Sequence, residues 1–237
     1  MLFCVMGNSG AGKDTLIDLV TANDESIKRL KLVTDRPKRP NESEDRYIFV
    51  SKEEYDRMLE DFDNHFVESR SFKVADGSVW RYGTPINDFN RATLKQDVYI
   101  TTCTPMQFTA YYNSLEKNYK WHLYPIVLTM ISPKARLERM LNRIEDDYDS
   151  VNEVCRRFCA DEDPVYENKM LPMYTYPNDD EIDLDRNVEL VLYLANMLKK
   201  THLYALDRHR LFIEDTKYLA GFYREDCCDD DCIKEEK

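Results

Sequence analysis

Glycine is scarce in this sequence: only six of the 237 residues are glycine, and three of those lie between positions 7 and 12. Long apolar runs are also missing. No stretch approaches the ~18 uninterrupted apolar residues of a membrane-spanning helix, and the apolar opening at residues 1–6 is too short for a signal peptide. We therefore expect a cytoplasmic protein without a membrane partner.

Basic residues are in deficit, because 33 Lys and Arg face 45 Asp and Glu and the net charge is −12. A chain this acidic has no overall attraction for a nucleic-acid backbone, so we predict no nucleic-acid partner, and a phosphate ligand requires a local basic pocket. The seven cysteines form no CxxC pair, and Cys4 and Cys103 lie in apolar runs, as is typical of free thiols in a reducing compartment. The acidic tail around Cys227, Cys228 and Cys232 is interpreted as solvated rather than as a zinc site.

Apolar runs and amphipathic stretches alternate along most of the chain. This alternation is typical of an α/β fold, in which helices cover both faces of a parallel sheet. The expected strands are residues 2–6, 30–33, 98–103 and 126–131, and the expected helices begin near residues 13, 51, 132, 149 and 188. Residues 34–90 interrupt this order and are interpreted as an inserted lobe.

A glycine-rich motif follows the first expected strand. It satisfies G-x-x-x-x-G-K with Gly7, Asn8, Ser9, Gly10, Ala11, Gly12 and Lys13. Glycines let backbone N–H groups turn toward phosphate oxygens, the helix N-terminus adds a positive dipole end, and the lysine adds a charge. We interpret the motif as an ATP-binding loop. The alternative is a turn that merely lets the helix pack on the strand.

The residue after the motif lysine is Asp14 rather than the usual Ser or Thr, and a hydroxyl follows at Thr15. Both residues are included in the predicted ATP site. We assign the Mg²⁺ that accompanies ATP to Thr15 or to a water held by Asp14.

A loop rich in arginine follows the second expected strand. It contains Arg36 and Arg39, and Tyr47 comes shortly after them. Arginine forks and a tyrosine hydroxyl are suited to binding phosphate oxygens. Taken alone, such a loop is more typical of a solvated surface with ion pairs.

In combination, these segments resemble the guanylate kinase family. Its members follow the glycine motif with T-T-R-x-P-R-x-G-E, then D-Y-x-F-V-S, a glutamate, and Y-Y-G-T/S. The residues that match in order are Arg36, Arg39, Glu42, Tyr47, Phe49, Val50, Ser51, Glu68, Tyr82 and Thr84. The resemblance implies a P-loop NTPase core with a parallel sheet flanked by helices, an inserted lobe that binds the nucleoside monophosphate, and a helical lid.

The resemblance also implies roles for the matching residues. The phosphate of GMP would be bound by Arg36, Arg39, Tyr47 and Tyr82. Glu68 and Thr84 would face the guanine, with the carboxylate accepting from N–H groups of the base. A buried acceptor of that kind rejects adenine because polar groups are left unpaired.

The second half of the chain resembles the family's lid helix and the segment after it. The resemblance implies that Arg139, Arg143 and Arg157 stabilise the transferring phosphoryl group. It also places Asn178 near the adenine of ATP. We therefore expect a guanylate kinase-like domain over residues 1–198, followed by an extension over 199–237 with an acidic, cysteine-containing tail. Within the domain, the expected core is 1–33, 91–131 and 166–198, the monophosphate-binding lobe is 34–90, and the lid is 132–165.

Three departures from the family pattern keep other acceptors open. The strand that is acidic in the family reads Tyr99-Ile-Thr-Thr-Cys-Thr104, Leu32 stands near the position of a family serine, and the lid lacks the family's R-G. The first departure and the G-K-D sequence resemble ribose 1,5-bisphosphate phosphokinase, and G-K-D-T resembles phage deoxynucleoside monophosphate kinases.

Non-catalytic guanylate-kinase-like binding modules are a further alternative, although they typically lack an intact phosphate loop. We predict an enzyme that uses ATP and Mg²⁺ to phosphorylate GMP or dGMP, as a monomer or homodimer.

Overall fold

The computed structural model describes residues 1–38, 42, 45–94, 97–117, 119–130, 132–146, 151–161 and 175–200. Several predicted features lie outside the described residues. They are Arg39, the side chain of Arg143, residues 162–174 of the expected lid and core, and residues 201–237 of the expected extension.

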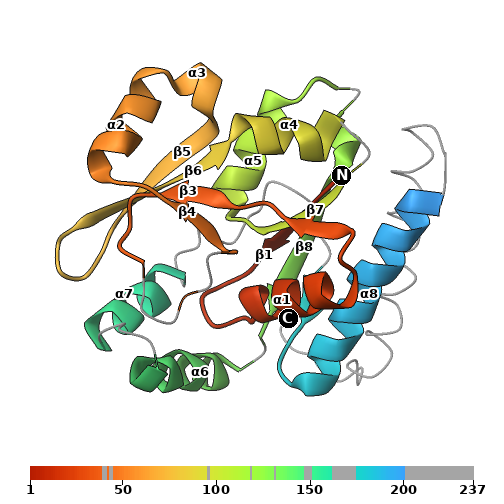
Figure 1. Cartoon of the computed structure of the whole chain (residues 1–237). Helices are drawn as coiled ribbons and strands as arrows, with labels where there is room; N and C mark the ends of the chain where they lie inside the picture. The colour runs from red at the N-terminus through yellow and green to blue at the C-terminus, as the bar shows by residue number, and fades with distance from the viewer. Residues whose placement is uncertain are drawn as a thin grey trace, which may run out of the picture.

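A five-stranded parallel sheet forms the core. Its order is β2 (Ile27–Arg29), β7 (Val98–Thr102), β1 (Leu2–Met6), β8 (Leu123–Thr129) and β9 (Thr175–Pro177). One face is covered by α1 (Lys13–Asn23) and α8 (Glu181–Lys200), and the other by α4 (Ile86–Leu94) and α5 (Pro105–Ser114) (Figure 1). A parallel sheet with helices on both faces confirms the predicted α/β class.

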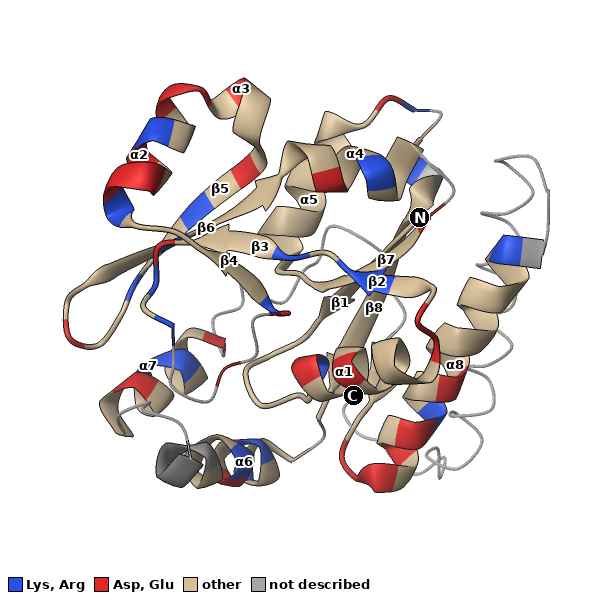
Figure 2. Cartoon of the chain, viewed as in Figure 1, with Lys and Arg blue, Asp and Glu red and all other residues tan. Residues whose placement is uncertain are grey.

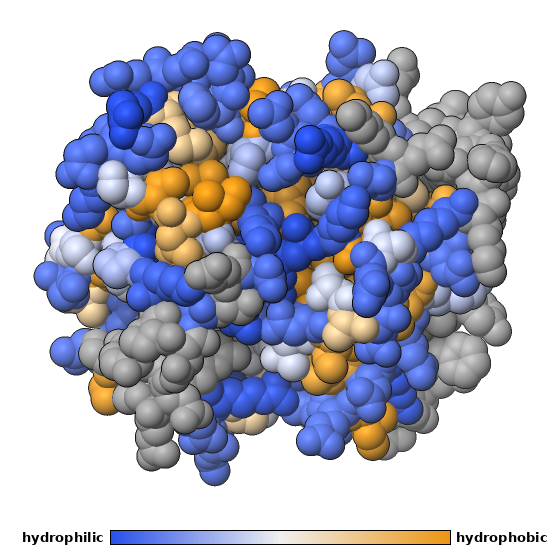
Figure 3. Space-filling model, in the orientation of Figure 1, coloured by the Kyte–Doolittle hydropathy of each residue, from blue (hydrophilic) through white to orange (hydrophobic). Residues whose placement is uncertain are grey.

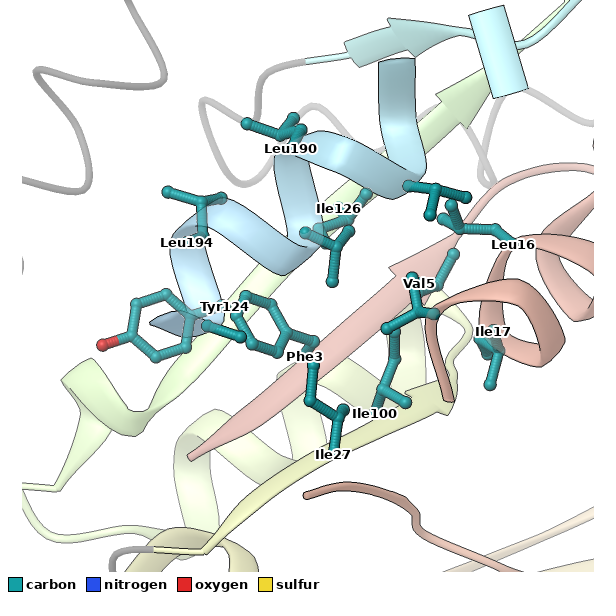
Figure 4. Packing of buried hydrophobic residues seen from close by; sticks show 14 of the residues in the cluster. Phe3, Val5, Leu16, Ile17, Ile27, Ile100, Tyr124, Ile126, Leu190 and Leu194 are labelled. Carbon is teal, nitrogen blue, oxygen red and sulfur yellow. The ribbon is translucent and has the colours of Figure 1, made fainter. Parts of the chain in front are cut away.

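The central strand β1 shows why this region reads as a continuous apolar run. All five of its residues are buried. Side chains alternate between the faces of a strand, so Phe3 and Val5 join one core cluster, whereas Leu2, Cys4 and Met6 join the other. Figure 4 shows the first cluster, with labelled side chains from β1, β8, α1 and α8 meeting between the sheet and the two helices. Burial of each large aliphatic or aromatic side chain contributes about 1.5–3 kcal/mol.

A second, mixed sheet stands beside the core (Figure 1). Its order is β4 (Tyr47–Phe49), β3 (Leu32–Thr34), β6 (Val79–Pro85) and β5 (Phe66–Lys73), with β3 and β4 parallel and the other pairs antiparallel. The helices α2 (Lys52–Glu60) and α3 (Phe62–His65) lie in this part of the chain. Tyr55 of α2 stacks on Phe66 at 5.2 Å between ring centroids, which gives this sheet a small core of its own.

The single strand predicted at residues 30–33 is wrong. The chain leaves the core sheet after β2, which ends at Arg29, and enters the second sheet at β3, which begins at Leu32. Leu30 and Lys31 bridge the two sheets, and Leu30 N–H still donates to the carbonyl of Ile100 in β7 (2.9 Å). The apolar residues did not reveal this change because Leu30, which lies between the strands, is as buried as Leu32 and Val33 of β3.

The remaining described helices are α6 (Pro133–Asp146), α7 (Val151–Asp161) and the short 3₁₀ helix η1 (Lys120–His122). The expected element boundaries are off by a few residues: β8 begins at Leu123 rather than 126, and α8 begins at Glu181 rather than 188. Among the described residues, no helix combines the length and the apolar character needed to cross a bilayer. The face in Figure 3 is largely hydrophilic with separate apolar patches.

Candidate functional site

The loop between β1 and α1, residues 7–13, is here called the glycine loop. Gly7 and Gly12 have φ values of 143° and 85°, which disfavour any residue with a side chain. A Cβ on Gly7 would lie 2.5 Å from the Leu128 carbonyl oxygen, and one on Gly12 would lie 2.5 Å from Nδ2 of Asn178. Gly12 is also the N-cap of α1, so the first amides of the helix point toward the loop.

Two side chains, one from the glycine loop itself and one from a distant segment, donate hydrogen bonds to the loop carbonyls. Lys13 Nζ donates to the carbonyls of Gly7 (2.7 Å) and Asn8 (2.9 Å). Asn178, which is 2% exposed, donates from Nδ2 to the carbonyl of Ala11 (2.7 Å). Asn178, which was expected near the adenine of ATP, therefore holds the loop in place. Its contact with adenine stays a prediction.

The topology of the core sheet opens a crevice beside the glycine loop. Helix α1 follows β1 on one face, and α5 follows β7 on the other, so the chain diverges at the carboxyl ends of these two neighbouring strands. Ligands of open α/β sheets bind at such a switch point. A cavity of about 340 Å³ lies there, and Thr102, Cys103 and Thr104 at the end of β7 form part of its wall.

This cavity gathers charged and aromatic side chains from three parts of the fold. It is lined by Lys13 and Asp14 from the glycine loop and α1, by Tyr47 and Tyr82 from the second sheet with Arg36 from the loop after β3, and by Arg156 and Arg157 from α7. Figure 2 shows basic residues on α7 and along the second sheet, whereas the start of α8 is acidic. A local basic pocket thus exists within an acidic chain.

Arg36 is held at the cavity wall by a buried ion pair. Its side chain is 4% exposed and donates from Nη2 to Glu42 (2.6 Å), and the guanidinium lies 5.1 Å from the ring centroid of Tyr47. Burial, together with the nearby Asp14 carboxylate, raises the pKa of Tyr47. The phenol therefore stays protonated at neutral pH and can donate a hydrogen bond to a ligand.

The two predicted magnesium residues occupy different environments. Asp14 lines the cavity, is 39% exposed and has a contact of 3.4 Å with Arg29. Thr15 is exposed and is not part of the cavity wall. A carboxylate at the edge of a phosphate site fits the oxygen ligands that Mg²⁺ prefers.

The arginines of α7 are organised by Glu153. Its carboxylate accepts from Arg156 (2.8 and 2.9 Å) and Arg157 (2.8 Å), and also from Ala75 N–H (2.9 Å) at the tip of the β5–β6 hairpin. Burial would raise the pKa of Glu153, but the hydrogen bonds from Arg156, Ala75 and Arg157 lower it to about 2. The second sheet and α7 are therefore joined across the cavity by a charged group.

Arg139 and Arg136 on α6 lie away from the cavity wall. Arg139, a predicted catalytic residue, donates to the carbonyls of Asn178 (2.9 Å) and Asp179. Arg136 is 3% exposed, and its guanidinium carbon lies 4.3 Å from the ring centroid of Phe158. Its Nη1 pairs with Oδ2 of Asp161 (3.5 Å). Sequence reasoning missed Arg136, although its spacing of three residues from Arg139 puts both on one side of α6.

Glu68 and Thr84, the expected guanine-reading pair, meet in a buried network. Thr84 donates to Glu68 Oε1 and shares a hydrogen bond with Tyr111 (2.7 Å), and Gln107 donates to Thr84 (3.2 Å). Neither residue of the pair is part of the cavity wall, whereas Arg70, which the sequence analysis did not single out, is. Arg70 is two residues from Glu68, and side chains two residues apart lie on the same face of a strand. This periodicity could have identified Arg70 from the sequence.

Curated guanylate kinases match parts of this chain. That of Zymomonas mobilis is 35% identical over 95 residues, which cover 36% of this chain and 37% of the relative. That of Haemophilus influenzae is 42% identical over 62 residues, which cover 25% of this chain and 30% of the relative. Over these segments the chain resembles guanylate kinases in sequence. The predicted family resemblance is thereby confirmed, and the match spans about a third of the length of these relatives.

The fold is that of a guanylate kinase as well. The crystal structure of guanylate kinase from Anaplasma phagocytophilum aligns with a TM-score of 0.54 and 16% identity, over 84% of this chain and 87% of that chain. Models of known protein families find no match in the chain. The chain thus shares this fold over most of its length, and its sequence similarity to guanylate kinases is detectable in a shorter part.

Proposed function

We propose that this protein is a nucleoside monophosphate kinase that transfers the terminal phosphoryl group of ATP to GMP or dGMP, with Mg²⁺. The observation that carries the proposal is one cavity lined both by Lys13 and by Arg36, Tyr47 and Tyr82. Phosphoryl transfer needs two nucleotides held in line and their negative charge neutralised, with little covalent chemistry from the protein. A basic cavity at a glycine loop supports that reaction.

In this proposal the glycine loop binds the donor. Its amides and Lys13 contact the phosphates of ATP, and Asn178 keeps the loop open for them through its bond to Ala11. Asp14 is favoured over Thr15 as the residue that holds Mg²⁺, directly or through water, because it alone of the two lines the cavity. The metal supplies charge neutralisation at the phosphates when bound.

The second sheet binds the acceptor. The planar fork of Arg36 and the phenols of Tyr47 and Tyr82 bind the monophosphate, together with Arg39. Arg157, with Arg156 beside it, contacts the transferring group from α7. The roles of Arg139 and Arg143, a cytoplasmic location and a monomeric or homodimeric state stay predictions from the sequence.

The proposal is tested with purified protein, ATP and Mg²⁺ in an assay of ADP release. GMP and dGMP are expected to be the best acceptors in a panel with AMP, dTMP, UMP and ribose 1,5-bisphosphate. The physical reason is the buried Glu68 carboxylate: its Oε1 already accepts from Arg70 and Thr84, and an adenine would leave Oε2 without a donor at a cost of about 1–3 kcal/mol. Faster turnover of ribose 1,5-bisphosphate than of GMP would assign the site to that sugar phosphate instead, and no turnover of any acceptor would indicate a binding module.

Asp161 of α7 contacts the backbone of the glycine loop in this structure. Its Oδ2 accepts from the amide of Ser9 (2.6 Å), as a phosphate oxygen would. We expect Asp161→Asn to lower the Kd of ATP by about 3- to 10-fold, because a charge-assisted bond that competes with ATP is worth about 1.5–3 kcal/mol and is only partly lost. Calorimetry with ATP measures this. Asp63→Asn, at an exposed position on α3, is the control, and weaker ATP binding by Asp161→Asn would contradict the expectation.

A further inference from the structure

Arg70 separates Glu68 from the cavity. Both residues lie on β5, two positions apart, and therefore on the same face of the strand. Arg70 lines the cavity and Glu68 does not, and Arg70 Nη1 donates to Glu68 Oε1 (2.7 Å). A base that enters from the cavity meets the guanidinium before or beside the carboxylate.

The carboxylate behind Arg70 is fixed from its far side. Glu68 is 8% exposed and Thr84 is fully buried, and the Thr84 hydroxyl donates to the same Oε1 that accepts from Arg70. Tyr111 and Gln107 hold Thr84 in turn. All the hydrogen bonds that the described residues make to Glu68 converge on Oε1, so Oε2 is the oxygen available to a ligand.

Arg70 carries more donors than its surroundings use. One of its N–H groups is engaged with Glu68, and its buried Nε has no hydrogen-bond partner among the residues that the structure describes. The rings of Phe72 (6.0 Å) and Tyr82 (5.9 Å) flank the guanidinium and restrict its orientation. Burial alone lowers the pKa of an arginine, but the Glu68 carboxylate raises that of Arg70 above its ordinary value, so the group is charged.

A buried, charged donor without a partner is costly, at about 1–3 kcal/mol. Such a group at a cavity wall is therefore suited to a ligand that brings acceptors. A guanidinium fork matches two adjacent acceptors, and the O6 and N7 atoms of guanine are such a pair. Adenine instead presents an amino donor beside N7, which repels the fork.

We propose that Arg70 is a specificity-determining residue that reads the 6-oxo edge of a 6-oxopurine monophosphate. The inference rests on the proposed function and deepens it. Arg70 donates to O6 and N7, while Glu68 accepts from the N–H groups at positions 1 and 2 of the same base. IMP shares O6 and N7 with GMP but lacks the 2-amino group, so the two residues make separable contributions.

The test is a comparison of kcat/KM for GMP, IMP and AMP in the wild type, Arg70→Met, Arg70→Lys and Glu68→Gln. Arg70→Met is expected to lower the values for GMP and IMP by a common factor of about 10–100, because a bidentate contact is worth about 1–3 kcal/mol. The AMP value stays within about threefold of the wild type, as expected for a base that makes no such contact. Glu68→Gln lowers the GMP/IMP ratio instead.

Two further variants keep the test interpretable. Arg70→Lys retains the ion pair with Glu68 but loses the fork, so it is expected to stay folded and to discriminate less against AMP than the wild type. Lys73→Met, at an exposed position on the same strand, is expected to change no ratio.

The inference is overturned if Arg70→Met leaves the GMP/AMP ratio unchanged, or if it changes the GMP/IMP ratio as Glu68→Gln does. The second result would make Arg70 only a support for Glu68. If the wild type phosphorylates none of the three nucleotides, the proposed function fails separately. In that case calorimetry on the same variants gives the Kd values of GMP, IMP and AMP. The GMP/AMP and GMP/IMP ratios of these Kd values then decide the role of Arg70.

Discussion

Replacement of Lys13 by alanine is expected to lower kcat for ATP and GMP by on the order of 10² or more, because its charge acts mainly on the transferring phosphoryl group. In the structure the ammonium donates to the carbonyls of Gly7 and Asn8 and lines the cavity. It is therefore already positioned over the loop that would hold the phosphates. Steady-state kinetics with saturating nucleotides measures the effect.

Two comparisons separate the charge of Lys13 from its structural contacts. Lys13→Met keeps the volume of the aliphatic chain and is expected to lose kcat to the same extent. Lys28→Ala, whose side chain is 55% exposed on the core sheet, is the control and should retain wild-type kinetics. Near wild-type turnover by both Lys13 variants would show that the glycine loop is only a structural turn.

Arg36→Met is expected to lower kcat/KM for GMP by on the order of 10² to 10³, since each net hydrogen bond to a charged group is worth about 1.5–3 kcal/mol and the fork can make two. The Kd of ATP alone should change by less than about twofold, because a contact confined to the acceptor cannot alter binding of the donor. Kinetics with varied GMP and calorimetry with each nucleotide measure the two effects. Arg57→Met on α2, where the side chain is 70% exposed, provides the control.

The ion pair of Arg36 requires a second variant. Loss of one partner from a buried pair costs about 3–5 kcal/mol of stability, and the Glu42 side chain is only 6% exposed. In the double variant Arg36→Met/Glu42→Gln the orphaned carboxylate is removed, so the protein should fold while still binding GMP weakly. Equal losses for ATP and GMP in a folded double variant would mean that this loop is structural.

Short-range features of the fold could be predicted because their causes are local. The β1 run, the glycine loop and the start of α1 are consecutive, and the need for glycine at positions 7 and 12 is visible in the left-handed φ values there. The N-cap at Ser51 is another local case, since its hydroxyl accepts from Glu54 N–H (3.1 Å) three residues later. The end of β2 at Arg29 and the start of β3 at Leu32 were not predictable, because Leu30 between the strands is as buried as Leu32 and Val33, and the sequence carries no sign of which sheet each strand joins.

The order of the matched motifs predicted the resemblance to guanylate kinases, but the hydrogen-bond partners of the site residues depend on the tertiary structure. Asn178, for which contact with adenine stays a prediction, donates to the carbonyl of Ala11 across 167 residues of chain. Arg139, whose contact with the transferring group stays a prediction, donates to the carbonyls of Asn178 and Asp179. A motif specifies which side chain is present, whereas its hydrogen-bond partner depends on how the elements pack.

By itself the sequence determined the α/β class, the glycine loop and the guanylate kinase relationship, because periodicity, glycine placement and motif order are properties of neighbouring residues. Only the tertiary structure decided that Arg70 lines the cavity and Glu68 does not, that Glu153 joins α7 to the β5–β6 hairpin, and that Asp161 reaches the glycine loop. The last two of these contacts join groups on different elements, as with Ser9 and Asp161, 152 residues apart. Their formation follows from the packing of two sheets and a helix around one cavity, which no local pattern encodes.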